Sequence, residues 1–206
     1  MEGAGGGGAS RTCSRPPADE RWTGELVLAS RSPQRRAILA QLAVRFVVDV
    51  PEVDELSEGE PRAVVLENAL RKARAVAGEL VLGVDTAVVC DGRAYGKPAD
   101  RAEAEAGLRR LADREHRVLS AVALIGPAGR ERTGLAVTTV RFRALSEALL
   151  AWYLDSGEWR ERAGGYAIQG RGAALVEGIE GDYLNVVGLP VATLLGLAPE
   201  LLGETG

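Results

Sequence analysis

The sequence is poor in the side chains that bind transition metals and form disulfides. It contains one histidine, His116, and two cysteines, Cys13 and Cys90, with no Cys-x-x-Cys pair. A tetrahedral zinc site needs a set of histidine and cysteine ligands, and a disulfide framework needs more cysteines than these. These absences exclude a zinc-binding or disulfide-stapled domain, and they predict a reduced, cytoplasmic setting.

Long apolar runs and an excess of basic residues are also missing. No run approaches the roughly 20 apolar residues that a helix needs to cross a bilayer, so no membrane association is expected. Lysine and arginine number 25 against 29 aspartates and glutamates, which gives a net charge of −4. A nucleic-acid-binding surface usually carries a basic stripe, so nucleic acid is not an expected partner.

Composition divides the chain into one large domain and two ends. Residues 1–24 are rich in glycine, proline and arginine and have too few apolar side chains to fold, so we expect a disordered tail. The glycines at 3–8 follow no strand, which argues against a phosphate loop. We expect a single domain over 25–199 and a short C-terminal tail over 200–206.

Helix and strand patterns alternate early in the domain, and strands cluster in its middle. The apolar runs predict strands near 25–29, 45–50, 80–90, 118–126 and 134–145. Capping and periodicity predict helices near 33–43, 62–77, 101–112 and 147–156, with a short one ending near 197. This order is typical of the α/β class and predicts a mixed, twisted sheet with flanking helices.

Asp85 is the most informative residue because it interrupts an apolar strand. In LVLGVDTAVV it shares one face with Val81, Ala87 and Val89, so its carboxylate is expected to point into apolar surroundings. Such a group is usually paired, hydrogen-bonded or bound to metal, because burying its bare charge is costly. Lys97 follows after a turn, and the alternative to a functional site is a structural Asp85–Lys97 ion pair.

The segment 30–36 has the features of an anion-binding turn. Ser32 is expected to cap a helix that begins at Pro33, and the terminus of that helix presents unpaired N–H groups. Arg35 lies at the N-terminal end of the buried stripe, where its guanidinium can reach over the edge of the sheet. A well-capped surface helix with solvated arginines is the alternative.

A lysine and an acidic loop add to this candidate phosphate site. Lys72 falls on the buried face of its predicted helix, so its side chain either extends outward to solvent or projects into a cavity. The acidic loop at 52–55 ends in Glu55, and carboxylates without histidine favour Mg²⁺ or Mn²⁺. Lys97 would neutralise phosphate charge, whereas a solvated loop is the alternative for the acidic segment.

Glycine-rich stretches at 163–172 and 181–190 allow a ligand to approach the backbone closely. Gln169 offers an amide suited to reading the polar edge of a base, although glycine clusters more often mean tight turns. His116 and Cys90 are expected to be structural. Phosphate-binding groups, acidic segments and the amide of Gln169 together predict a site for a nucleotide polyphosphate.

Five blocks in order resemble the Maf family of nucleoside triphosphate pyrophosphatases. They are LVLASRSPQRRAIL, VDE at 53–55, the helix with Lys72, GVDTAVVCDGRAYGKP, and AGGYAIQGRGA with GDYLNVVGLP. The resemblance implies an α/β fold of the inosine-triphosphate-pyrophosphatase type, with two lobes around a cleft and commonly a homodimer. It also implies cleavage of a nucleoside triphosphate between its α- and β-phosphates with a divalent metal, and a link to inhibition of septum formation.

The resemblance also implies roles for single residues. Asp85 matches the proton acceptor of the Asp-Thr-x-Val block, and it would hold the metal together with Glu55. Glu55, Lys72 and Lys97 match catalytic or phosphate-contacting positions. The Ser-x-Ser-Pro-x-Arg phosphate-binding turn corresponds here to Ser30, Ser32 and Arg35.

Two residues favour a pyrimidine substrate. Thr86 and Gln169 are similar to residues of family members that act on dTTP and UTP, and the 7-methyl-GTP branch carries other residues there. Gln34 departs from both types, which usually place arginine or tryptophan after Ser-Pro. We therefore expect a dTTP/UTP pyrophosphatase with Gln34 among its substrate-binding residues. The alternatives are a 7-methyl-GTP pyrophosphatase, an enzyme for non-standard purine nucleotides, and a non-catalytic nucleotide-binding regulator of septum formation.

Overall fold

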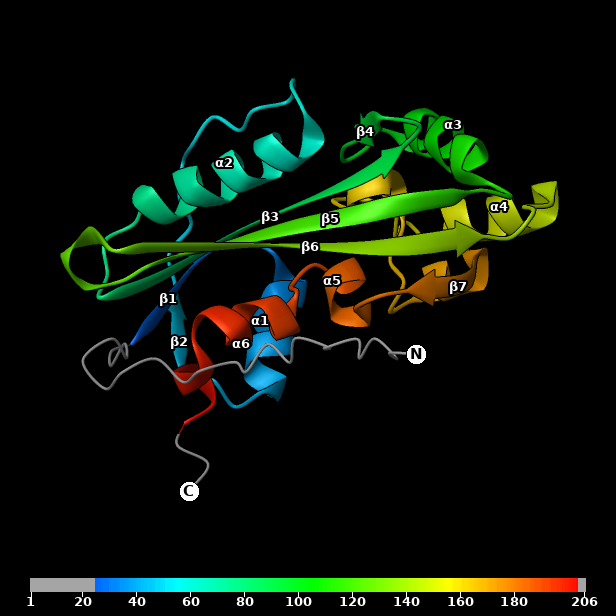
Figure 1. The fold of residues 1–206 in the computed structure, drawn as a ribbon. Coiled ribbons are helices and arrows are strands. Elements are labelled where there is room, and N and C mark those ends of the chain that lie inside the picture. The colour runs from blue at the N-terminus through cyan, green and yellow to red at the C-terminus, as the bar shows by residue number, and fades with distance from the viewer. Residues whose placement is uncertain (1–24, 204–206) are drawn as a thin grey trace, which may run out of the picture.

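A seven-stranded mixed sheet with helices on both faces forms the body of the protein (Figure 1). The computed structural model describes residues 25–203, so the tail expected at 1–24 lies outside the described residues. The predicted α/β class is confirmed. Near the other end, a 3-10 helix spans Pro199–Leu202, and its Leu201 packs against a hydrophobic core.

The sheet has the order β2-β1-β3-β5-β6-β7, and β4 pairs with β3 outside this path. The strands span Leu26–Ala29 (β1), Phe46–Val48 (β2), Leu80–Cys90 (β3), Arg93–Tyr95 (β4), Glu115–Ile125 (β5), Glu131–Phe142 (β6) and Val176–Glu180 (β7). β1 is parallel to both β2 and β3, whereas β3 and β5 run antiparallel. Parallel pairing therefore changes to antiparallel pairing at β3, the strand that carries Asp85.

The helix α2 covers one face of the sheet, and α1 and α6 lie on the other side of it (Figure 1). Residues of α3 and α4 pack in a separate core with Val88. The helices span Pro33–Gln41 (α1), Pro61–Arg74 (α2), Arg101–Leu111 (α3), Glu147–Asp155 (α4), Tyr183–Val187 (α5) and Val191–Leu197 (α6). No helix within residues 25–203 combines the length and the apolar content needed for a membrane span.

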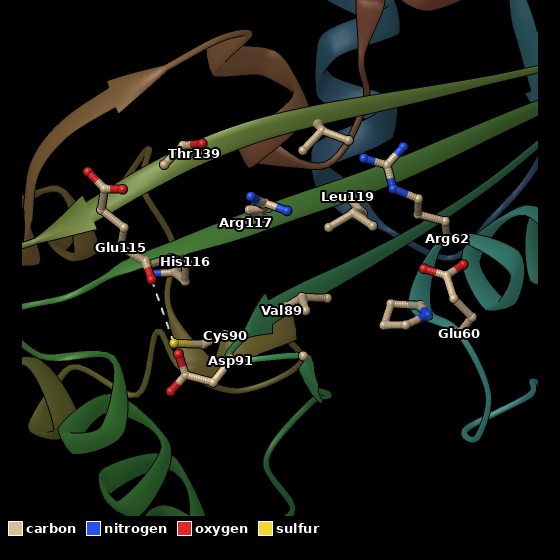
Figure 2. A pocket seen from close by; sticks show the side chains of 13 residues that line it. Glu60, Arg62, Val89, Cys90, Asp91, Glu115, His116, Arg117, Leu119 and Thr139 are labelled. Atoms are coloured by element: carbon tan, nitrogen blue, oxygen red, sulfur yellow. Dashed lines mark hydrogen bonds between the residues drawn. The ribbon is translucent and has the colours of Figure 1, made fainter.

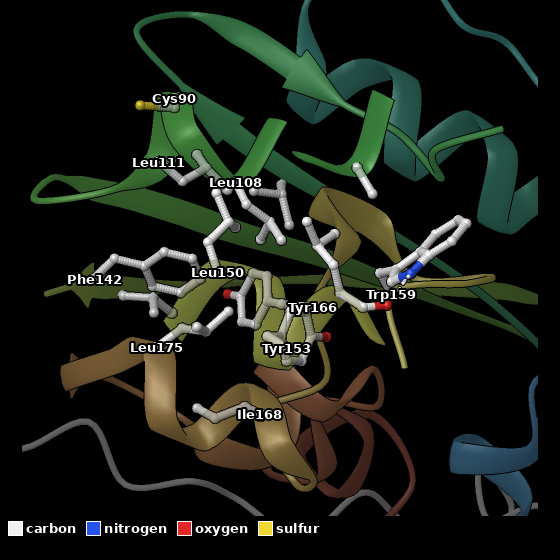
Figure 3. Packing of buried hydrophobic residues seen from close by; sticks show 14 of the residues in the cluster. Cys90, Leu108, Leu111, Phe142, Leu150, Tyr153, Trp159, Tyr166, Ile168 and Leu175 are labelled. Carbon is white, nitrogen blue, oxygen red and sulfur yellow. Dashed lines mark hydrogen bonds between the residues drawn. The ribbon is translucent and has the colours of Figure 1, made fainter. Parts of the chain in front are cut away.

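Alternation along β3 divides its side chains among three hydrophobic clusters. Val81 belongs to the cluster under α2. Leu82 and Val84 belong to the first core, which includes residues of α1 and α6. Val88 belongs to the second core, which includes residues of α3 and α4 (Figure 3). The face opposite α2 thus carries two cores, and Thr86 stands between them along the strand.

The predicted two-residue period around Asp85 is confirmed. Val81 is buried beneath α2, and Ala87 and Val89 pack against the same cluster. Asp85 lies on this face with 9% of its surface exposed. The carboxylate therefore sits among apolar side chains, so its partners must come from the residues that cover that face.

Local signals place the helices that the site depends on. Ser32 caps α1 by accepting a hydrogen bond from the backbone N–H of Arg35, and Pro33 opens the helix. Ser146 caps α4 in the same way. β7 and α5 were not predicted, because the glycine-rich sequence around them carries no clear period. Pairing with β6 makes 176–180 a strand.

Candidate active site

Asp85, Lys72 and Glu55 form a connected ion-pair cluster. The Nζ of Lys72 lies 2.7 Å from Oδ1 of Asp85 and 3.0 Å from Oε1 of Glu55. The Lys72 side chain is 10% exposed, so it projects into the protein rather than outward to solvent. α2, β3 and the loop before α2 therefore bring together three of the four residues expected to be catalytic, and the cation beside Asp85 is Lys72 rather than Lys97.

Asn68 holds this cluster together by hydrogen bonds, and it was not predicted from the sequence. Its Nδ2 donates to Oδ2 of Asp85 at 3.3 Å and to the carbonyl of Leu56 at 3.0 Å, while its Oδ1 accepts from the Leu56 N–H at 2.7 Å. The amide thus holds the acidic loop beside α2 and next to Glu55. Its position four residues before Lys72, on the same helix face, is the signal that could have revealed it.

The buried side chain of Arg35 connects the Ser-Pro turn to the sheet by hydrogen bonds. Its Nη1 donates to Oγ of Ser30 and to the carbonyl of Val84, each at 2.9 Å. Its Nη2 donates to Oγ1 of Thr86 at 3.1 Å, and its Nε donates to the carbonyl of Gly188 at 2.9 Å. Burial lowers the pKa of Arg35. Most of its donors therefore serve the fold, and the guanidinium fixes Ser30 and Thr86 in place.

The helix terminus at the Ser-Pro turn is joined to a distant segment through Gln34. Oε1 of Gln34 accepts from Oγ of Ser32 at 3.1 Å and from Nη1 of Arg162 at 2.6 Å. The backbone N–H of Ser32 donates to Oγ of Ser30 at 3.2 Å. The turn is thus preorganised, and Arg162, which was not predicted from the sequence, belongs to its surroundings.

Lys97 and Gln169 lie at more exposed positions than the cluster around Asp85. Lys97 is paired with Glu161 at 3.0 Å, and both side chains are mostly exposed. Gln169 is exposed at the end of the segment that begins with the 3-10 helix Ala163–Gly165. The described structure therefore gathers Ser30, Arg35 and Thr86 in one group, and Glu55, Lys72 and Asp85 in another, with Lys97 held by a third segment.

A cavity of about 490 Å³ lies away from this site, beyond the N-terminus of α2 (Figure 2). Its lining includes Arg62 and Arg117, which are exposed, and Cys90, whose thiol faces the Glu115 carbonyl at 3.6 Å. None of the predicted site residues lines it. Its charged side chains are exposed, and its one buried titratable ring is that of His116, so this cavity offers no buried charge cluster comparable with that around Asp85.

His116 is structural, as expected from the sequence. It is 2% exposed, its Nε2 lies 2.9 Å from the Tyr166 hydroxyl, and its ring meets those of Phe142 and Tyr166 edge to face. Burial lowers the pKa of His116 to about 4. The imidazole is therefore neutral at physiological pH and packs against Phe142 and Tyr166 of the second core.

Comparison with known proteins places the chain in one family. The chain matches the family described as Maf-like protein over residues 25–201. It is 51% identical to the dTTP/UTP pyrophosphatase of Symbiobacterium thermophilum over 173 residues, which cover 81% of this chain and 89% of that protein. It is 49% identical to the dTTP/UTP pyrophosphatase of an Anaeromyxobacter species over 187 residues, covering 88% and 89%.

Among solved structures, the Staphylococcus aureus Ham1 protein overlaps with 57% of this chain and 71% of its own, with a TM-score of 0.43 and 18% identity. That overlap is too partial to support a functional conclusion. The sequence match is much more extensive, because the family match covers nearly all of the residues that the structure describes. The chain belongs to the Maf family.

Proposed function

We propose that this protein is a nucleoside triphosphate pyrophosphatase that hydrolyses dTTP and UTP to the monophosphate and pyrophosphate. The observation that carries the proposal is the cluster of Glu55, Lys72 and Asp85, held beside the preorganised Ser-Pro turn of a Maf family member. Relatives that share about half of its sequence are named dTTP/UTP pyrophosphatases. A charged cluster in apolar surroundings is the kind of site that phosphate chemistry uses.

The reaction needs a water molecule, a proton acceptor and cations for the phosphates. Water would attack the α-phosphorus, the bond to the bridging oxygen would break, and pyrophosphate would leave. Asp85 would accept the proton of the attacking water, since it is the buried carboxylate at the centre of the cluster. Lys72, Lys97 and the N–H groups at the start of α1 would hold phosphate oxygens, so most of the rate gain would come from positioning and charge stabilisation.

Glu55 and Asp85 fit a divalent metal such as Mg²⁺ or Mn²⁺. Their carboxylates meet at the ammonium group of Lys72, and carboxylate oxygens are the ligands that these ions prefer. Residues 25–203 contain no group of three or more acidic, histidine or cysteine side chains that would enclose a metal alone. Mg²⁺ is commonly bound by one or two carboxylates with substrate phosphates completing its shell. When bound, such an ion would neutralise phosphate charge and orient the triphosphate.

Base selection would fall mainly to Gln169. The Thr86 hydroxyl is already engaged, because it accepts from Arg35 and lies 2.9 Å from the Ser120 hydroxyl. The exposed amide of Gln169 can offer both a donor and an acceptor to the edge of a pyrimidine ring. Thr86 and Gln34 would then shape the site around the nucleotide rather than supply its principal polar contacts.

A substrate panel tests the proposal. Pyrophosphate release would be measured with dTTP, UTP, CTP and 7-methyl-GTP in the presence of Mg²⁺ or Mn²⁺. We expect the highest kcat/KM for dTTP and UTP. Preference for 7-methyl-GTP would overturn the base assignment, and a protein that binds nucleotides without releasing pyrophosphate would instead be a non-catalytic regulator.

Asp85→Asn tests the role of Asp85 in the reaction. An amide can neither accept the proton of the attacking water nor replace a carboxylate as a metal ligand, so kcat should fall by at least about 10²- to 10⁴-fold. The matched control is Asp91→Asn, which changes an exposed aspartate paired with Arg114 at the end of the same strand. That control should keep the wild-type kcat. Circular dichroism should show both variants folded, and near-normal turnover of Asp85→Asn would remove this residue from the mechanism.

We also propose that the protein is cytoplasmic and forms a homodimer. The buried thiol of Cys90 is free, which suits a reducing compartment. Light scattering of the purified protein would determine the number of chains in the assembly.

A further inference from the structure

Arg162 carries a hydrogen-bonding edge that the fold leaves unused. Its Nη1 donates to Gln34, as described above. Its Nε is buried and has no partner among the described residues. Buried N–H groups are nearly always paired, so an orphaned one indicates a missing acceptor. Because Nη1 is occupied, the free side of the guanidinium is the Nε–Nη2 edge, which is the edge that binds carboxylates and phosphates side-on.

The segment around Arg162 also holds Lys97 in place. The backbone N–H of Gly164 donates to the carbonyl of Gly96 at 3.0 Å, which fixes the loop of Lys97 against the segment of Arg162. Gly164 has a φ of +68°, and a Cβ there would lie 2.8 Å from Val88, so only glycine fits this close approach. The two cations are therefore carried by two loops that are bonded to each other.

One acid faces this group of cations. Glu161 pairs with Lys97, and the hydrogen bond from Lys97 lowers the pKa of Glu161, with further contributions from the charges of Lys97, Arg31 and Arg162. The side chain of Glu161 is 77% exposed, so its contact with Lys97 is easily exchanged. An anion with more charge than one carboxylate would compete successfully for the same cations.

We propose that Arg162 is a substrate-binding residue that contacts oxygens of the β- or γ-phosphate, and that Gln34 is the positioning residue that orients it. The proposal rests on the proposed function. Gln34 offers its oxygen to Ser32 and to Arg162 together, so it links the helix terminus to the guanidinium. A triphosphate that extends from the Ser-Pro turn toward Lys97 passes Arg162, and it displaces Glu161 from Lys97.

Arg162→Gln tests the contact. Hydrogen bonds to charged groups predict that its loss raises KM for dTTP about ten- to a hundred-fold, with a smaller change in kcat. The dissociation constant of inorganic pyrophosphate, measured by calorimetry without turnover, should rise by a similar factor. The matched control is Arg160→Gln, which removes the same charge two residues earlier from a guanidinium stacked 4.5 Å above the Trp159 ring. That control should keep both constants within about two-fold.

Gln34→Ala separates positioning from direct contact. With Arg162 present it should raise KM several-fold, and in an Arg162→Gln background it should add nothing further, because Gln34 acts through Arg162. Equal and additive effects in both backgrounds would assign Gln34 a contact of its own. The positioning role would then be wrong.

The outcomes distinguish this inference from the proposed function. If the wild type releases no pyrophosphate from any triphosphate, the proposed function fails. If the wild type is active and Arg162→Gln keeps its KM and its affinity for pyrophosphate, only the inference on Arg162 fails. Should Arg162→Gln not fold, Arg162→Lys decides, because an ammonium group cannot meet Gln34 and present a side-on edge together. An unchanged KM in Arg162→Lys would overturn the inference.

Discussion

The ammonium group of Lys72 pairs with two carboxylates whose surroundings differ. The side chain of Asp85 is 12% exposed, whereas that of Glu55 is 54% exposed. An exposed ion pair contributes about 0–1 kcal/mol, but removing one partner of a buried pair destabilises a protein by roughly 3–5 kcal/mol. Glu55 can therefore exchange Lys72 for another cation at little loss, while Lys72 and Asp85 remain together. Asp85 is the fixed member of the cluster and Glu55 the adaptable one.

His116 predicts how stability depends on pH. It is the single histidine of the chain, and burial lowers its pKa from 6.5 to about 4. Between these values the unfolded chain binds a proton that the folded protein does not. The contribution of His116 to the unfolding free energy is therefore complete above pH 6.5 and is lost as the pH falls toward 4. The shift corresponds to a loss of about 3 kcal/mol between pH 7 and pH 4, measurable by urea unfolding.

The control for this prediction is His116→Gln. Glutamine does not titrate, and its side chain can still meet the Tyr166 hydroxyl that lies beside the imidazole. Between pH 7 and pH 4, the unfolding free energy of the variant should fall by about 3 kcal/mol less than that of the wild type. Parallel pH curves for wild type and variant would show that His116 does not titrate as its burial requires.

Among the helices and strands, the contact between α2 and β3 determines the geometry of the cluster of Glu55, Lys72 and Asp85. A Cβ on Gly83 would lie 2.1 Å from the carbonyl oxygen of Ala69 and 2.8 Å from the backbone nitrogen of Ala73. Gly83→Ala must therefore push α2 away from the strand, and overpacking of this kind destabilises by roughly 1–3 kcal/mol. Because α2 carries Lys72, kcat should also fall, as steady-state kinetics and chemical unfolding would show.

Gly107→Ala is the matched control for Gly83→Ala. Gly107 lies within α3, and a Cβ there meets no atom within 4 Å. Alanine is the better helix former, so this variant should be more stable by about 0.5–1 kcal/mol and fully active. Wild-type stability and kcat in Gly83→Ala would show that the backbone of α2 has more freedom than the close contact allows.

The elements that the sequence predicts well are those with a local period or cap. Ser32 and Pro33 mark the start of α1, and the alternation around Asp85 gives the face of β3 correctly. Glu177 and Glu180, by contrast, make β7 look like a polar loop, and it becomes a strand only by pairing with β6. Nonlocal backbone pairing of this kind leaves no period in the sequence.

In the candidate site too, contacts set by a local period could be predicted from the sequence, and nonlocal contacts could not. The helical period places Lys72 on the face that meets Asp85, so their proximity could be predicted in principle. The partner of Lys97 is Glu161, and the partner of Gln34 is Arg162, 128 residues away. Both contacts involve a segment without regular period, whose path depends on tertiary packing. Such contacts could not be predicted from residue spacing.

In the molecule taken together, the proposed substrate site joins regions that pack separately. The first core includes residues of α1 and α6, and the second includes residues of α3 and α4. Polar side chains fill the space between the two cores: the Thr86 hydroxyl meets Ser120, and Asn185 donates to Thr138. The Ser-Pro turn begins α1, whereas Arg162 follows α4 in the chain. A nucleotide that contacts both would stabilise the protein as a unit.

This bridging predicts a thermal shift on ligand binding. At a hundred times its dissociation constant, a ligand of the folded state adds about 2.7 kcal/mol of stability, which for a chain of this size raises Tm by about 5–10 °C. The α,β-methylene analogue of dTTP with Mg²⁺ avoids turnover and should produce this shift in the wild type. At the same concentration, a tenfold loss of affinity in Arg162→Gln should reduce the shift to about half. Arg160→Gln should show the full shift, and equal shifts in both variants would mean that the guanidinium of Arg162 takes no part in holding the triphosphate.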